Sequence, residues 1–246
     1  MRRLALFAPL LILALAQVEP LRRALQAHGF LGREVRALYQ EDRLTLYTPQ
    51  GQVAEVGLSR AWLDPKGCRY RQEVLPGGRE EGRSVVLFTP ALQALLLPDG
   101  RRVPLPDPLL LDLLRGFDTG LPGLLHPPER VEAVGEVALP GGRKGLGYRV
   151  GRGRPTCRPR GVLEAAGWEG MVVLDGEGRL LAERYPSAVF GGEVLVAYGD
   201  YREVGGVLFP FRAEGYLGEA RLFLGETLRL EVNPSLPEGL FTLPPP

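Results

Sequence analysis

The chain has 246 residues, the size of one large domain or two small ones. Its formal net charge of +1 gives no electrostatic reason to expect a nucleic-acid partner. Glycine (33) and proline (23) are frequent and divide the chain into short segments, as all-β and α+β folds require. Lysine occurs only at Lys66 and Lys144 and asparagine only at Asn233, a thermophile-like bias that a GC-rich genome would also produce.

Residues 1–16 have the pattern of a secretory signal peptide. Two arginines precede an apolar run, Leu4–Leu15, and a small-x-small cleavage site ends at Ala16. The run is too short for a stable membrane span; an uncleaved anchor or a buried helix is the alternative. We expect the mature protein to begin at Gln17, to be soluble in the periplasm or outside the cell, and to form a single domain over residues 17–246.

After the signal peptide, apolar residues at helical spacing predict an amphipathic helix over Val18–His28, which Gly29 ends. Apolar and polar residues then alternate around glycine and proline turns, a pattern typical of antiparallel hairpins. A single helical turn is expected at Leu163–Gly167. The strands expected in this part of the chain are Arg43–Thr48, Gln52–Leu58, Cys68–Glu73, Arg130–Leu139, Gly145–Val150, Met171–Leu174 and Leu180–Arg184.

The segment Asp107–Phe117 predicts the best helix of the chain. Asp107 is expected to cap its first turn, and Pro108 is expected at the first helical position, where no N–H is needed. Gly116 is expected to end the helix. Its apolar face is made of Leu109, Leu110, Leu113 and Leu114.

The segment Val194–Pro234 predicts three successive antiparallel strands. Alternate residues of a strand face opposite sides of a sheet, so period-two alternation indicates one buried face. Two apolar sets are therefore expected to face one interior: Val207, Phe209, Phe211 and Ala213, and then Leu222, Leu224, Leu228, Leu230 and Val232. Asn233-Pro234 stops the last strand.

Parts of this segment also resemble a known family. Asp200-Tyr201-Arg202, Gly205-Gly206 and Phe209-Pro210 look like a strand pair of the periplasmic outer-membrane lipoprotein carrier (LolA/LolB-like) superfamily. Asn233-Pro234, followed by Phe241 and Pro244, is similar to the closing motif of that family. The matching segment covers roughly the last fifth of the chain. Gly82–Leu97 resembles a strand of the same family and the strand after it. Within it, Leu87-Phe88-Thr89-Pro90 departs from the family, which usually has an aromatic-rich turn with aspartate there.

The resemblance implies an α+β fold in which a strongly curved antiparallel sheet, a half-open barrel, carries a few helices on its concave face. It also implies a non-enzymatic carrier that holds the acyl chains of a lipid or lipidated protein and is loaded by a membrane-bound partner. The residues expected to line the acyl cavity are Phe88, Leu109, Leu110, Leu113, Leu114, Phe209, Phe211, Leu222 and Leu224. The same residues would fill a packed core, so a secreted interaction module with a filled barrel is the alternative.

No catalytic motif, cofactor motif or metal-ligand cluster stands out. The chain has no G-x-S-x-G, H-E-x-x-H or P-loop pattern. Its two histidines stand apart from any cysteine or second histidine. We expect His28 to be a cation at a helix end and His126 to be a loop residue.

Two further features have open alternatives. Arg149, Arg152, Arg154 and Arg158 belong to a basic run that would suit an anionic head group or membrane surface, or would form a solvated loop. Cys68 and Cys157 are the only cysteines. An even pair outside the cytoplasm favours a disulfide over two separate thiols.

Overall fold

The structure is a computed structural model, and it describes residues 19–126, 128–159 and 167–243. The expected signal peptide, residues 1–16, lies outside these ranges. So does all of the helical turn expected at Leu163–Gly167 except its last residue. Within the described ranges, no helix is both long enough and apolar enough to cross a membrane.

The described strands form one sheet of thirteen strands, in the order β6-β5-β4-β3-β2-β1-β13-β12-β11-β10-β9-β8-β7. Every neighbouring pair is antiparallel. Two meanders therefore meet at the centre, where the first strand pairs with the last. The bounds are β1 Leu38–Tyr47, β2 Val53–Asp64, β3 Arg69–Pro76, β4 Ser84–Thr89, β5 Leu92–Leu96, β6 Arg102–Pro104, β7 Arg130–Ala138, β8 Lys144–Arg152, β9 Trp168–Leu174, β10 Leu180–Ser187, β11 Gly192–Val204, β12 Val207–Leu217 and β13 Ala220–Val232.

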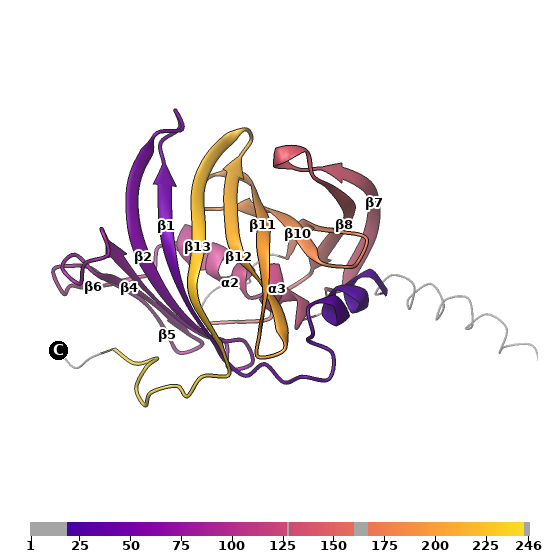
Figure 1. Cartoon of the computed structure of the whole chain (residues 1–246). Coiled ribbons are helices and arrows are strands. Elements are labelled where there is room, and N and C mark those ends of the chain that lie inside the picture. Colours follow the sequence, from indigo (N-terminus) through magenta and orange to yellow (C-terminus); the bar gives the residue numbers. More distant parts are fainter. Residues whose placement is uncertain (1–18, 127, 160–166, 244–246) are drawn as a thin grey trace, which may run out of the picture.

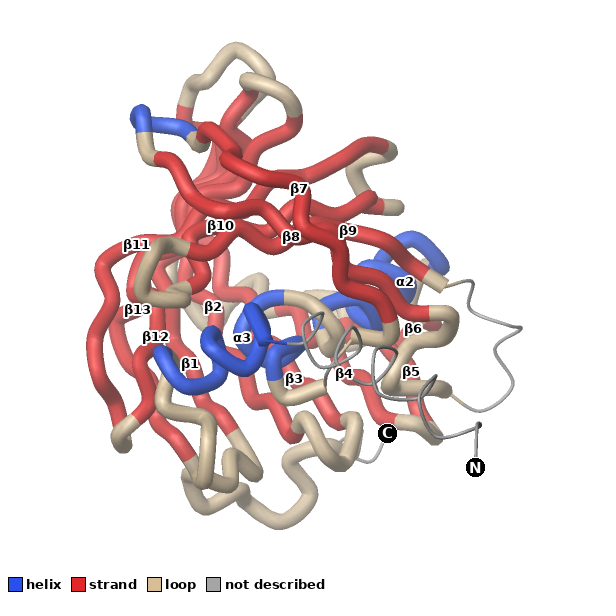
Figure 2. The backbone as a smooth tube through the Cα atoms, turned by 90° about the vertical axis from the view of Figure 1, so that its right-hand side faces the viewer, coloured by secondary structure: helices blue, strands red, loops and turns tan. Residues whose placement is uncertain are grey.

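The sheet curves strongly but does not close, because β6 and β7 remain its two edges (Figure 1). The chain between these edges carries two helices, α2 (Asp107–Gly116) and α3 (Gly120–Leu124). Figure 2 shows both helices inside the curve of the sheet. The expected α+β fold, a half-open barrel with helices on its concave face, is confirmed.

The start of α2 differs from the expectation. Asp107 is the first helical residue and makes no capping hydrogen bond, while Pro106 occupies the N-cap position. Pro108 lies in the first turn, where its missing N–H costs no helical bond. The acidic side chain of Asp107 still lies at the positive end of the helix dipole, so it contributes by charge instead of by capping.

Two groups of contacts hold α2 against the sheet. Leu110 and Leu114 are buried, with 6% and 2% of their surface exposed. The carboxylate of Asp112 accepts hydrogen bonds from the Ser187 hydroxyl (2.5 Å) and from the backbone N–H of Ala188 (2.7 Å), at the end of β10. The helix is therefore fixed by a buried leucine pair on one side and by a polar anchor on the other.

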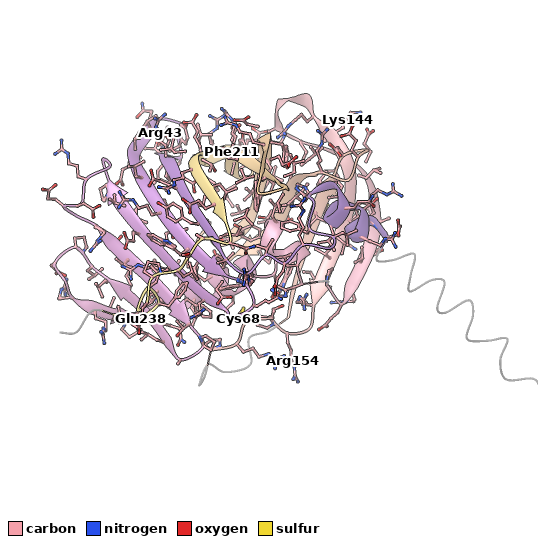
Figure 3. The ribbon with its side chains drawn as sticks, turned by 60° about the horizontal axis from the view of Figure 1, so that its bottom comes forward. Arg43, Cys68, Lys144, Arg154, Phe211 and Glu238 are labelled. Carbon is pink, nitrogen blue, oxygen red and sulfur yellow. A yellow bond between two sulfur atoms is a disulfide. The ribbon has the colours of Figure 1, made fainter. Side chains whose placement is uncertain are left out.

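The expected disulfide between Cys68 and Cys157 is confirmed, with Cα atoms 5.4 Å apart. It joins the turn between β2 and β3 to the segment after β8, across 89 residues. Cross-linking a loop of this length contributes about 4–5 kcal/mol in the chain-entropy model. Cys157 is fully buried in a cluster that also contains Val86, Phe88, Leu105, Leu110, Leu114 and Phe117. Cys68 is labelled in Figure 3.

The N-terminal helix packs near the starts of β10 and β12. Residues 19–27 are helical, within the expected range, and Leu21 and Ala24 join the main core cluster with Val207 and Phe209. His28 is not the expected helix-end cation. It is fully buried and forms hydrogen bonds with β10 and β12, so it serves as a link in the core.

Candidate functional site

A cavity of about 510 Å³ lies between the concave face of the sheet and the two helices. Residues of α2, α3, β1–β3 and β10–β13 line it, and it is partly open to solvent. Figure 2 shows the helices that bound it and the strands that curve around it. Its volume lies within the range of about 300–1,000 Å³ that is usual for small-molecule sites.

Most of the lining is apolar. Leu109 and Leu113 of α2, Phe117 just after it and Leu121 of α3 line the cavity, whereas Leu110 and Leu114 of α2 point into the disulfide cluster. The sheet adds further apolar side chains: Leu38, Leu44, Leu63, Phe209, Phe223 and Leu230. Such a surface can hold an alkyl chain, since each buried CH₂ contributes about 0.8 kcal/mol.

A polar band crosses the floor of this cavity. It consists of Gln40, Asp42, Ser59, Gln72 and Thr227, all of which line the cavity. The register explains the band: Asp42 on β1 lies opposite Thr227 on β13 and Ser59 on β2. Gln40 lies opposite Ala61, whose other neighbour is Gln72. Directly opposite residues share a face of the sheet, so four strands bring these polar groups together.

Hydrogen bonds connect the polar band. The Thr227 hydroxyl donates to Asp42 over 2.8 Å, and the amide of Gln40 donates to its two carboxylate oxygens over 2.9 and 3.0 Å. The amide of Gln72 donates to the Ser59 hydroxyl over 2.8 Å. Burial raises the pKa of Asp42, although the bonds from Gln40 and Thr227 oppose this shift.

A second carboxylate, that of Glu183 on β10, borders the cavity and joins the sheet to α3. It accepts hydrogen bonds from the Tyr198 hydroxyl (2.5 Å) and from the backbone N–H of Gly120, the first residue of α3. Burial raises the pKa of Glu183, and the hydrogen bonds act in the opposite direction. Because α3 begins at this carboxylate, Glu183 sets where the helix meets the cavity.

The residues expected to line an acyl cavity divide into two groups. Leu109, Leu113 and Phe209 do line it. Phe88, Leu110 and Leu114 lie instead in the buried disulfide cluster. Phe211 is buried in the main core, under the guanidinium of Arg202 at 4.5 Å from its ring centroid, and does not line this cavity.

The expected register was wrong for Leu222 and Leu224. β12 and β13 are antiparallel neighbours as expected, but Phe223 and Gly225 line the cavity, so Leu224 faces the other side. Leu222 falls at an irregularity of the same ladder. A bulge leaves Leu228 unpaired with β1 and 47% exposed. The bulge reverses the alternation, and Leu230 beyond it faces inward again.

The basic run does not gather on one surface. Arg149 pairs with Glu132 on β7 over 3.3 Å, and Arg152 turns inward to Asp118, also over 3.3 Å. Arg154 and Arg158 are exposed. Figure 3 shows Lys144 and Arg154 at opposite ends of the molecule, because the run follows the length of β8. Within the described residues, therefore, Arg149 and Arg152 have different acidic partners.

The polar band was missed in the sequence, although a signal for it exists. The expected strand began at Arg43, whereas β1 begins at Leu38. From that residue the inward positions are Leu38, Gln40, Asp42 and Leu44, which alternate with outward residues. Among the described residues, no group of three or more His, Cys, Asp and Glu is placed to hold a metal ion.

No protein-family model matches the chain. No curated protein matches its sequence. Solved structures do match. A protein domain from Vibrio parahaemolyticus, described as outer membrane lipoprotein-sorting, shares 13% identity at a TM-score of 0.55 and aligns over 90% of this chain and 95% of its own. A LolA superfamily protein from Nitrosomonas europaea shares 10% identity at a TM-score of 0.56 over 90% and 97%.

A DUF1329 family protein from Desulfovibrio piger shares 9% identity at a TM-score of 0.59, over 92% of this chain and 96% of its own. At these identities the likeness shows a common fold. The chain therefore has the LolA-like fold that its last strands resemble in sequence.

Proposed function

We propose that this chain binds a lipid, or the acyl chain of a lipidated protein, in the cavity between the sheet and α2–α3, and carries it outside the cytoplasm. The observation that carries the proposal is a cavity of about 510 Å³ with leucine and phenylalanine side chains on both walls. The LolA-like fold adds weight, because one structure that shares it is described as a lipoprotein-sorting domain. The role is binding and release, without catalysis.

The disulfide supports a location outside the cytoplasm. Cys68 and Cys157 are paired, and such bonds persist in oxidising compartments and are rare in the cytosol. The basic and apolar start of the chain is consistent with export. A carrier in that compartment needs a source of its cargo, and we propose a membrane-bound loading partner.

Two variants of α2 test the proposal. Leu113 lines the cavity, whereas Leu111 on the same helix is also partly buried but does not line it. Leu113→Glu places a charge where the alkyl chain would lie, so it is expected to abolish binding of a fluorescent fatty-alcohol probe. Leu111→Glu is the matched control and is expected to bind as the wild type does.

Mass spectrometry of gently purified protein is the second measurement. We expect co-purified lipid in the wild type and in Leu111→Glu, but not in Leu113→Glu. If the wild type carries no lipid and binds the probe no better than Leu113→Glu does, the carrier function is wrong. The interaction module would then be the better hypothesis.

A further inference from the structure

The polar band indicates what kind of ligand the cavity takes, an inference that rests on the proposed function. We infer that the ligand is an amphiphile with a non-anionic head that donates hydrogen bonds, such as an amide, hydroxyl or amine. The head lies at Asp42, and the alkyl chain lies along the leucines of α2.

The first step is the acceptor capacity of Asp42. An ionised carboxylate has about four lone-pair sites. Donors from the protein come from Gln40, two residues before Asp42 on β1, and from Thr227, opposite Asp42 on β13. Asp42 also lines the cavity, so its remaining acceptor sites are available to a ligand. A head that donates a hydrogen bond is the complement of such a group.

The second step is the charge of the lining. Its carboxyl side chains are Asp42, Asp112 and Glu183, and none of the described lining residues is Lys, Arg or His. The nearest arginines in sequence already have partners: Arg115 pairs with the lining carboxylate of Asp112 over 3.1 Å, and Arg43 pairs with Glu226 over 3.7 Å. A carboxylate or phosphate head would enter without a counter-ion of its own, beside the carboxylate of Asp42.

The third step concerns Tyr70, which lines the cavity on β3. Burial, and then the nearby charge of Asp42, raises the pKa of Tyr70, so its hydroxyl keeps its proton. Among the described residues it has no hydrogen-bond partner. It can donate to the oxygen of an amide or alcohol while Asp42 accepts from the same head. The band therefore offers both a donor and an acceptor to a neutral polar group.

The test uses three probes of equal chain length at neutral pH: decan-1-ol, decylamine and decanoate. Each displaces Nile red from the full-length protein, which gives three affinities. We expect the wild type to bind decan-1-ol and decylamine about tenfold or more tightly than decanoate, because the anion faces like charge. Asp42→Asn removes the charge in the cavity and is expected to reduce the ratio of decylamine to decanoate affinity about tenfold.

Glu41→Gln is the matched control. Glu41 neighbours Asp42 but pairs with Arg60 (3.3 Å) and does not line the cavity. It changes the net charge equally and is expected to leave the ratio unchanged. If Asp42→Asn does not fold, the wild-type ratio decides. Decanoate binding as tightly as decylamine, or an equal change in Glu41→Gln, overturns the head-group assignment while amphiphile binding stands. Failure of Nile red and all three probes to bind overturns the proposed function as well.

Discussion

The ring of His28 accepts a hydrogen bond from the backbone N–H of Leu180 over 2.9 Å, at a site that is fully buried. Its other nitrogen, Nδ1, donates to the carbonyl oxygen of Leu208 over 2.7 Å. These two partners require the neutral Nδ1–H tautomer, because a backbone N–H can only donate. One imidazole thus ties the N-terminal helix to both β10 and β12.

Protonation of His28 should destabilise the fold. Burial lowers the pKa of His28 from its usual 6.5, so the neutral form is favoured in the folded state. The stabilisation is therefore complete above about pH 6.5 and is lost as the pH falls toward the folded pKa. We expect His28→Gln to cost about 1–3 kcal/mol near neutral pH, and the cost to shrink in acid. Urea unfolding at a series of pH values measures this. A destabilisation by His28→Gln that stays constant with pH would contradict the prediction. His126→Gln is the control for the other histidine.

Glu183 should have the opposite pH dependence. Burial raises the pKa of Glu183 above its usual 4.5, so the folded state favours the protonated form. The contribution of Glu183 to folding stability is present below about pH 4.5 and is lost as the pH rises through the pKa of Glu183 in the folded state. We expect the stability of Glu183→Gln relative to the wild type to increase with pH. Thermal melts of both proteins across this range test the sign, and a relative stability that decreases with pH would refute it.

Gly225 offers a way to fill the cavity without strain. It lines the cavity, and a Cβ at this position would meet nothing closer than the Ala213 carbonyl oxygen at 3.8 Å. Gly225→Val is expected to keep or raise stability by about 0.5–1 kcal/mol, because valine suits a strand. It should weaken probe binding about tenfold by excluding about two methylenes, each worth about 0.8 kcal/mol.

Gly199 on β11 is the control for this prediction, since it is equally uncrowded and does not line the cavity. Gly199→Val should bind the probe as the wild type does. Probe titration of the two variants measures whether the cavity is blocked, and urea unfolding shows whether each variant is still folded. Unchanged affinity in a folded Gly225→Val protein would show that the probe binds elsewhere.

Loss of the disulfide should lower stability. Removing a native disulfide costs about 2–5 kcal/mol, and here the bond closes a loop between Cys68 and Cys157. Protein reduced while unfolded and then refolded in reductant should have a lower urea midpoint than oxidised protein. The double variant Cys68→Ser/Cys157→Ser should not respond to reductant. Equal midpoints for the reduced and oxidised wild type would rule out a stabilising role.

Local sequence patterns predicted the positions of the strands better than they predicted which side chains face the cavity. The alternation within Val194–Pro234 predicted that β12 and β13 are antiparallel neighbours, because the two strands are adjacent in sequence. The bulge at Leu228 depends on pairing with β1, which the local alternation does not contain. Leu222 and Leu224 were therefore assigned to the wrong face.

The candidate site was harder to predict for a similar reason. Gln40 and Asp42 interrupt the apolar alternation of β1, so the strand seemed to start at Arg43. Their polar partners come from strands that are distant in sequence. His28 is a second example, since its two partners lie 152 and 180 residues away. From sequence alone, a polar side chain among apolar residues is expected to be exposed to solvent. Only knowledge of its hydrogen-bond partner shows that it can be buried.

The pairing of β1 with β13 has a consequence for the order of folding. Asp42 and Thr227 are bonded across 185 residues, whereas every other strand pair joins successive strands of a meander. Contacts this distant form slowly, because much chain entropy is lost before they are made. We expect the two meanders to form first and the central seam to close last. A chain cut before β13 would keep its other hairpins and would still lack the floor of the cavity, so ligand capture can begin only when the final strand has been added.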